Sequence, residues 1–112
     1  MTDMTVDELI SRCAFTPLAI PNGSRIVNGA YIGDLLSWVM GRAGESNAWI
    51  TIMSNINVIA VATLSDVSCV IFAEGVRPDD QIIETAKAKG VNLLVSDFPI
   101  YETAIKLSAL SI

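Results

Sequence analysis

Strand-like and helix-like segments alternate from residue 25 to the end of the chain, and this alternation constrains the fold more than any other feature. Four segments rich in apolar and β-branched residues are typical of strands, namely 25–28, 49–53, 68–73 and 91–95. The stretches between them carry apolar side chains at helical spacing. Strands joined by helices form right-handed crossovers and a mostly parallel sheet. We therefore predict an α/β fold, with a mostly parallel sheet that has helices on both faces.

Local signals predict where the helices begin and end. Thr5 and Glu8 have the spacing of a capping box, which predicts a short helix in a lead-in of residues 1–24. Pro78 followed by two aspartates is typical of a helix start, and Gly90 of a helix end. Residues 17–23 predict a loop with at most a short strand, and Ser96 or Asp97 is expected to start a last helix that runs through residue 110. The core-facing stripes of two middle helices are predicted to be Ile32, Leu35, Leu36, Val39 and Met40, and Ile56, Ile59, Ala60, Thr63 and Leu64.

The composition excludes several classes of partner. The 112 residues suffice for one domain, predicted to span residues 1–112, and a hydrophobic fraction of 52% fills a core. The net charge is −5 and the seven basic residues are scattered, so we expect neither nucleic acid nor an anionic membrane as a partner. The apolar runs are far shorter than the roughly 20 residues of a membrane-spanning helix.

The cysteines and the first residues predict a location. Cys13 and Cys69 both lie among apolar neighbours, which favours buried thiols in a reducing compartment, with a disulfide as the weaker alternative. The first twelve residues carry three acidic side chains where a secretory leader would have positive charge. We therefore predict a cytoplasmic protein.

The residues that carry most catalytic chemistry are missing from the sequence. The chain has no histidine, no Cys-x-x-Cys pair and no phosphate-binding loop of the Gly-x4-Gly-Lys-Ser/Thr kind. Asp79 and Asp80 are the tightest acidic pair, but both fall in the first turn of an expected helix, where capping explains them. We therefore predict that the chain is not an enzyme and has no metal site and no cofactor.

A candidate ligand site follows from the predicted topology. Ligands of open parallel sheets bind beyond the carboxyl ends of the strands, where loops 29–34, 54–57, 74–77 and 96–101 are expected to meet. Helix amides, hydroxyls and one cation in such loops would suit a nucleotide or another small anion. Each residue alone also has a structural explanation as a helix cap or a turn. The segment from Gly29 to Gly33 does not match the dinucleotide-binding fingerprint, because the third glycine of that motif is missing. The candidates are Gly29, Gly33, Asp34, Ser54, Asn55, Asn57, Glu74, Gly75, Arg77, Ser96, Asp97 and Tyr101.

Five segments of the chain resemble a known family. They are GDLLSWVM at 33–40, WITI at 49–52, NVIAVA at 57–62, EGVRPDD at 74–80 and GVNLLVS at 90–96. From residue 25 onwards the chain resembles the small stand-alone DRTGG-domain proteins. These are often labelled serine kinase of HPr, because they resemble the N-terminal domain of HPr kinase/phosphorylase, which is itself similar to the first domain of Mur ligases. The resemblance implies an α/β fold and a regulatory or ligand-sensing role, as for DRTGG segments beside CBS domains or in phosphotransacetylases.

The chain departs from that family in two places. The kinase label of the family also refers to a domain outside the matched region. Residues 54–57 read Ser-Asn-Ile-Asn where the pentapeptide that names the family is expected, and Asn55 stands where the stand-alone proteins have a histidine. The kinase chemistry belongs to a phosphate-binding-loop domain outside the matched region, so the resemblance implies no kinase activity here.

Three hypotheses of function follow. The first is a non-catalytic, dimeric regulatory module that senses an adenine nucleotide or a similar small anion. The second is a structural or interaction protein that dimerises, through a face with Trp38 or Trp49, and docks on a metabolic enzyme without binding a small molecule. The third and least favoured is a carboxylate-dependent enzyme that would use Asp34, Glu74 or Asp97.

Overall fold

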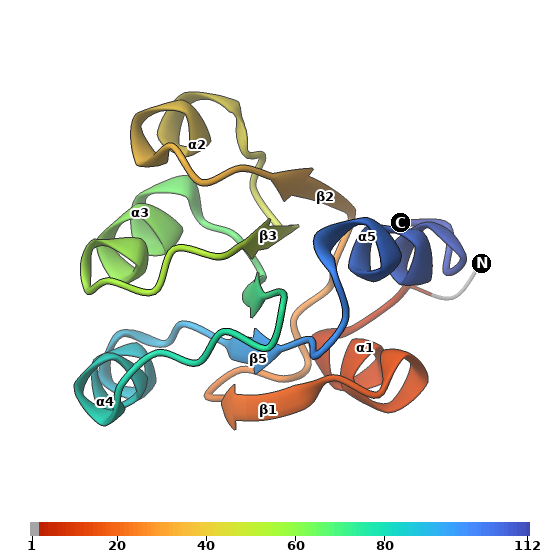
Figure 1. Ribbon diagram of the computed structural model, residues 1–112, viewed down its shortest axis with the longest axis horizontal. Helices are drawn as coiled ribbons and strands as arrows, with labels where there is room; N and C mark the ends of the chain where they lie inside the picture. Colours follow the sequence, from red (N-terminus) through yellow and green to blue (C-terminus); the bar gives the residue numbers. More distant parts are fainter. Residues whose placement is uncertain (1–2) are drawn as a thin grey trace.

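The computed structural model describes residues 3–112 and has the predicted α/β architecture (Figure 1). The five strands form one sheet in the order β1-β5-β4-β3-β2, in which β2, β3, β4 and β5 are parallel and β1 is antiparallel to β5. The elements are α1 (Val6–Cys13), β1 (Thr16–Ala19), β2 (Gly29–Ile32), α2 (Leu36–Arg42), β3 (Asn47–Thr51), α3 (Asn57–Ser65), β4 (Cys69–Phe72), α4 (Asp80–Lys89), β5 (Leu93–Val95) and α5 (Ile100–Ser108).

Helices cover both faces of the sheet, as predicted. On one face α2, α3 and α4 pack over a cluster that includes Trp49, Phe72 and Leu93. On the other face α1 and α5 pack over a cluster that includes Ile50, Ile71 and Leu94. The central strands β4 and β5 are buried on both faces, which explains why they read as continuous apolar runs.

The first strand of the parallel set begins later than the sequence predicts. β2 starts at Gly29, whereas 25–28 was the expected strand. Those residues join the N-terminal lead-in instead, because Ile26 forms an isolated bridge with Thr5 and the backbone N–H of Val27 donates to the carbonyl of Met4 at 2.8 Å. Val27 thereby packs in the cluster under α1. The predicted segment is extended, but its partner is not the main sheet.

Both predicted helical stripes are partly wrong. Ile32 lies in β2, and in α2 the buried or half-buried side chains are Val39 and Leu36, whereas Leu35 and Met40 are more than half exposed. In α3 the buried side chains are Val58, Ile59, Val61 and Ala62, so most of the predicted stripe faces outward. The sequence of α3 is apolar on both sides, and its periodicity therefore does not decide which side is buried.

The predicted helix caps are confirmed with one exception. The capping box of Thr5 and Glu8 is present, and Asp79 caps α4 by accepting a hydrogen bond from the backbone N–H of Ile82 at 3.0 Å. Gly90 ends α4 with a φ of 75°. The exception is α5, which begins at Ile100 without a side-chain cap from Ser96 or Asp97.

Both cysteines are buried free thiols. No helix among residues 3–112 is long and apolar enough to cross a membrane.

Candidate functional site

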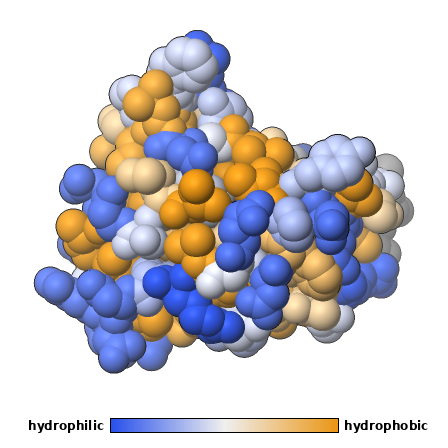
Figure 2. All heavy atoms as spheres, viewed as in Figure 1, coloured by the Kyte–Doolittle hydropathy of each residue, from blue (hydrophilic) through white to orange (hydrophobic). Residues whose placement is uncertain are grey.

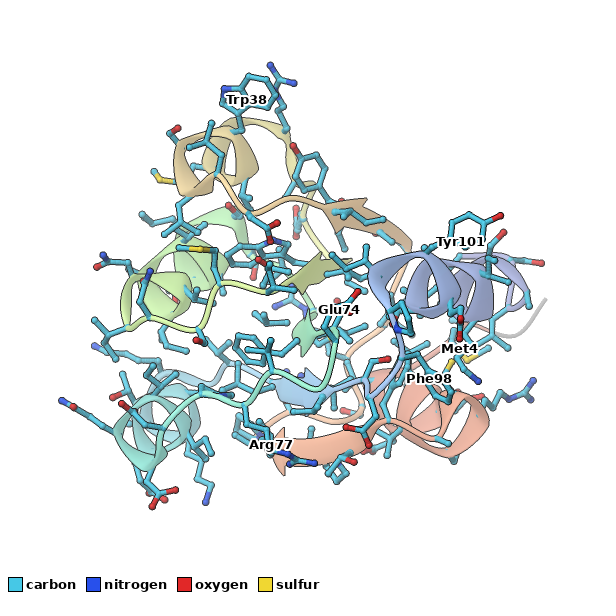
Figure 3. The ribbon with its side chains drawn as sticks, in the orientation of Figure 1. Met4, Trp38, Glu74, Arg77, Phe98 and Tyr101 are labelled. Atoms are coloured by element: carbon cyan, nitrogen blue, oxygen red, sulfur yellow. The ribbon has the colours of Figure 1, made fainter. Side chains whose placement is uncertain are left out.

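The parallel strands end side by side at one edge of the sheet. Because β5, β4, β3 and β2 are adjacent and run in the same direction, the loops that follow them meet at their carboxyl ends. Figure 3 shows Glu74 and Arg77 on the loop after β4, with Arg77 further toward β1. Eleven of the twelve predicted site residues lie in these loops or in the first turns of the helices that follow.

Asp34 fastens the ends of β2 and β3 to each other. Its Oδ1 accepts hydrogen bonds from the Thr51 hydroxyl at 2.8 Å and from the backbone N–H of Ile52 at 2.9 Å. Next to it, the carbonyl of Gly33 accepts a hydrogen bond from the indole Nε1 of buried Trp49 at 2.9 Å. The ring of Tyr31 lies so close to Gly33 that a Cβ would stand 2.8 Å from it. Gly33 and Asp34, both predicted as ligand-site residues, therefore have a structural role in holding β2 and β3 together at this edge.

Glu74 and Gly75 form a turn that ties the loop after β4 to the loop after β5. Both have left-handed backbones, with φ of 61° and 68°. Their backbone N–H groups donate to the carbonyls of Phe98 and Ser96, each at 2.9 Å. The Glu74 carboxylate accepts a hydrogen bond from the backbone N–H of Ile100 at 2.8 Å and so caps the start of α5. Sequence reasoning missed this cap because its two partners are 26 residues apart.

The residues around this turn differ in accessibility. Ser96 is buried and its hydroxyl lies 2.7 Å from that of Thr103, so it supports the loop and is not open to a ligand. Asp97 and Arg77 are exposed, and among residues 3–112 Arg77 makes no ion pair. Tyr101 is 77% exposed on the first turn of α5. These three side chains are free to meet a molecule at the edge.

The loop after β3 contributes neutral polar groups. Asn55 Oδ1 accepts a hydrogen bond from the backbone N–H of Asn57 at 2.9 Å, just before α3, whose N-cap residue Ile56 makes no side-chain capping hydrogen bond. Asn55 and Asn57 are exposed, and Ser54 is half-buried. Around them the surface is apolar, since Ile52 and Ile56 are 40% and 44% exposed. Figure 2 shows apolar residues over the centre of this view and toward α2 and α3, with hydrophilic residues between and around them.

Gly29 does not belong to this edge. It is the first residue of β2 and pairs with Asn47, the first residue of β3, at the opposite end of the strands. The prediction that residues 29–34 form a loop after the strand is therefore wrong for residues 29–32, because these residues are the strand itself. A Cβ at Gly29 would meet the Asn47 side chain at 3.0 Å, so close packing there explains the glycine.

A groove between α3 and α4 was not predicted as a site. It has a volume of about 480 Å³ and begins near the carboxyl edge at Asn57. Its other lining residues are mostly apolar, namely Ile56, Ile59, Ala60, Thr63, Leu64, Thr85 and Lys89. The signal was present in the sequence: α3 is apolar on all sides, which is more than one buried face requires.

The side chains at this edge that could take part in chemistry are few. No group of three or more metal-ligating side chains occurs among residues 3–112. The carboxylates of Asp34 and Glu74, two of the three proposed for the enzyme hypothesis, accept hydrogen bonds from the backbone. The exposed groups that remain are the guanidinium of Arg77, the carboxylate of Asp97, amides, a phenol and apolar side chains, which can bind and orient a molecule.

Comparison with protein-family models found no match, and neither did comparison with curated protein sequences. Among solved structures, the fold is similar to that of the CBS and DRTGG domains of the regulatory region of Clostridium perfringens pyrophosphatase, complexed with its activator diadenosine tetraphosphate. The TM-score is 0.75 at 14% sequence identity, and the match covers 92% of this chain but 45% of that one, so this chain spans less than half of that region. The chain therefore has a fold found in a CBS- and DRTGG-containing regulatory region, which confirms at the level of fold its resemblance to DRTGG-domain proteins.

Proposed function

We propose that this chain is a single-domain, non-catalytic regulatory module that binds an adenine nucleotide or a similar small anion at the carboxyl edge of its sheet. The observation that carries the proposal is the meeting of four loops at that edge, with exposed Arg77 as a cation that makes no ion pair within residues 3–112. A guanidinium binds phosphate through paired, charge-assisted hydrogen bonds. The proposal includes a cytoplasmic location and self-association into a dimer.

Two further features support the choice of ligand. The structurally similar regulatory region of the pyrophosphatase is complexed with an adenine dinucleotide activator. The edge also offers apolar surface at Ile52 and Ile56, against which a base or ribose would pack, beside amides at Asn55 and Asn57 that would orient it.

Isothermal titration with AMP, ADP, ATP and diadenosine tetraphosphate tests this function. We expect at least one of them to bind, and Arg77→Gln to weaken that binding about tenfold, which corresponds to about 1.4 kcal/mol. Lys87→Gln is the matched control, because it removes the same charge from the last turn of α4, away from the loops. It should leave the affinity within about twofold, since exposed distant charges are screened by salt.

The absence of heat with all four nucleotides at millimolar concentration would remove the ligand-sensing role. Equal weakening by Arg77→Gln and Lys87→Gln would instead mean that any binding depends on overall charge and that the site lies elsewhere.

The groove between α3 and α4 favours a second candidate function, that of an interaction protein which docks on a metabolic enzyme. Leu64 is 71% exposed in this groove, beside the apolar side chains of Ile56, Ile59 and Ala60. Such surface on a small domain is typical of protein contacts. If this candidate holds, Leu64→Lys will abolish binding to the enzyme partner while nucleotide titrations stay silent.

A further inference from the structure

One edge of the sheet is open and the other is protected. The antiparallel strand β1 carries Pro17 and an irregular register between Pro17 and Ala19, and both features prevent further strand pairing. At the opposite edge, β2 pairs regularly with β3 and has no proline, no charged residue and no bulge. Within residues 3–112 no strand pairs with its outer side.

The outer side of β2 presents unused backbone groups. The backbone N–H of Gly33 donates to the carbonyl of Ile50 in β3 at 3.2 Å. Because strand residues alternate in direction, the N–H and carbonyl groups of Ala30 and Ile32 point away from β3. Both residues are exposed. Another strand laid against β2 would find its hydrogen-bonding partners there.

Apolar side chains flank this edge on both sides. Trp38 is 53% exposed and lies on the side of α2 away from α3, with the guanidinium of Arg42 3.8 Å above its ring (Figure 3). Tyr101 lies on the side of α5 toward β2 (Figure 3). With Ile32 and Leu35, 47% and 57% exposed, we call these four side chains and the outer edge of β2 the β2 surface. Trp, Tyr and Arg are the residues enriched at the energetic centres of interfaces.

The area of the β2 surface fits a pair of identical chains. At about 150–200 Å² for each large side chain, the exposed fractions amount to roughly 400 Å² of mainly apolar area. A standard interface buries about 800 Å² per partner, of which somewhat more than half is apolar. The β2 surface therefore supplies most of the apolar part that one copy must bring to a stable dimer.

We propose that two copies of this chain pair through β2, antiparallel about a twofold axis at Tyr31. Ala30 of each copy then lies opposite Ile32 of the other, so all four outward-pointing residues are matched. Residues 26–33 are uncharged, and Asp34 falls opposite Asn28 and not opposite a second carboxylate. The repulsion expected between chains of net charge −5 is thus kept away from the contact. This inference rests on the self-association in the proposed function but not on its ligand.

The experiment measures mass by sedimentation over 1–200 µM protein. We expect a dimer for the wild type and at least a 100-fold weaker dimer for Ile32→Lys, which places a charge on each half of the contact. Leu64→Lys is the matched control, because it adds the same charge to an exposed leucine of α3 in the groove, away from β2. It should remain dimeric. Hydrogen exchange of the wild type adds a measurement without a variant: the amides of Ala30 and Ile32 should become protected as the concentration rises.

Three results would overturn the pairing. A wild type that is monomeric at 200 µM removes it, and so does a dimer that Leu64→Lys breaks and Ile32→Lys does not, which would assign the contact to the groove. If Ile32→Lys fails to fold, free exchange of the Ala30 and Ile32 amides in the wild-type dimer decides against it. None of these results depends on nucleotide titration, so the failure of the ligand proposal remains distinguishable.

Discussion

Glu74 combines an unfavourable backbone with a favourable side chain. Its φ of 61° is costly for any residue with a Cβ, whereas its carboxylate caps α5 through the backbone N–H of Ile100. We expect Glu74→Ala to lower the free energy of unfolding by about 1 kcal/mol, measured by urea denaturation. Glu74→Gly should cost less, because glycine adopts the positive φ without strain. Exposed Glu45 provides the control, and Glu45→Ala should change stability by less than about 0.5 kcal/mol. Equal losses for the two Glu74 variants would mean that the backbone is not strained.

Cys69 links stability to alkaline pH. Its complete burial raises the pKa of its thiol to about 12. The unfolded chain releases this proton near pH 9, so the stabilising contribution is fully present below pH 9 and is lost as the pH rises from about 9 to about 12. Between pH 8 and pH 10.5 this thiol alone should lower the free energy of unfolding by roughly 2 kcal/mol. Urea denaturation at both pH values measures it.

Cys69→Ala supplies the comparison, since its free energy of unfolding should fall by about 2 kcal/mol less over the same pH interval. Other groups titrate in this range but do so in both proteins. Identical pH dependence of the two would show that the thiol ionises without leaving the core. Cys13 should contribute with the same sign, since burial also raises its pKa while the positive charge of Lys106 lowers it.

At the scale of elements, substitutions in α3 test which side of this helix is buried, since both of its sides carry apolar residues. Val61 is 5% exposed and Leu64 is 71% exposed, although both are apolar. We expect Val61→Ala to cost about 2 kcal/mol of unfolding free energy, because it leaves a cavity over the sheet. Leu64→Gln should change it by less than about 0.5 kcal/mol. Thermal or urea unfolding compares the two, and a larger loss for Leu64→Gln would contradict the observed orientation.

The elements also show where sequence signals work. The starts of α1 and α4 and the end of α4 were predicted correctly, because Thr5, Asp79 and Gly90 act on residues within four positions of themselves. The start of β2 and the cap of α5 were not predicted, because both depend on residues distant in the sequence. Val27 donates a backbone hydrogen bond to Met4, and Ile100 donates one to the Glu74 carboxylate. Local chemistry is visible in a sequence, whereas the choice of a distant partner depends on packing.

At the scale of the whole molecule, the alternation of segments was enough to predict a mostly parallel sheet with helices on both faces. It could not predict that β1 joins this sheet antiparallel to β5, since Thr16–Ala19 is short and contains a proline. The candidate site followed from the same topology, because strand ends mark a ligand edge in any such sheet. Gly29 was misplaced because the strand was expected four residues too early, which moved its end to the wrong residue.

The turn at Glu74 and Gly75 gives the molecule a mechanical link between its two layers. This turn leads into α4 on one face of the sheet, and its hydrogen bonds hold the loop that leads into α5 on the other. A displacement of the turn would therefore be transmitted to both layers together. A molecule bound beside Arg77 would lie next to this turn. Its binding would therefore change the positions of helices on both faces of the sheet, including surfaces that it does not contact.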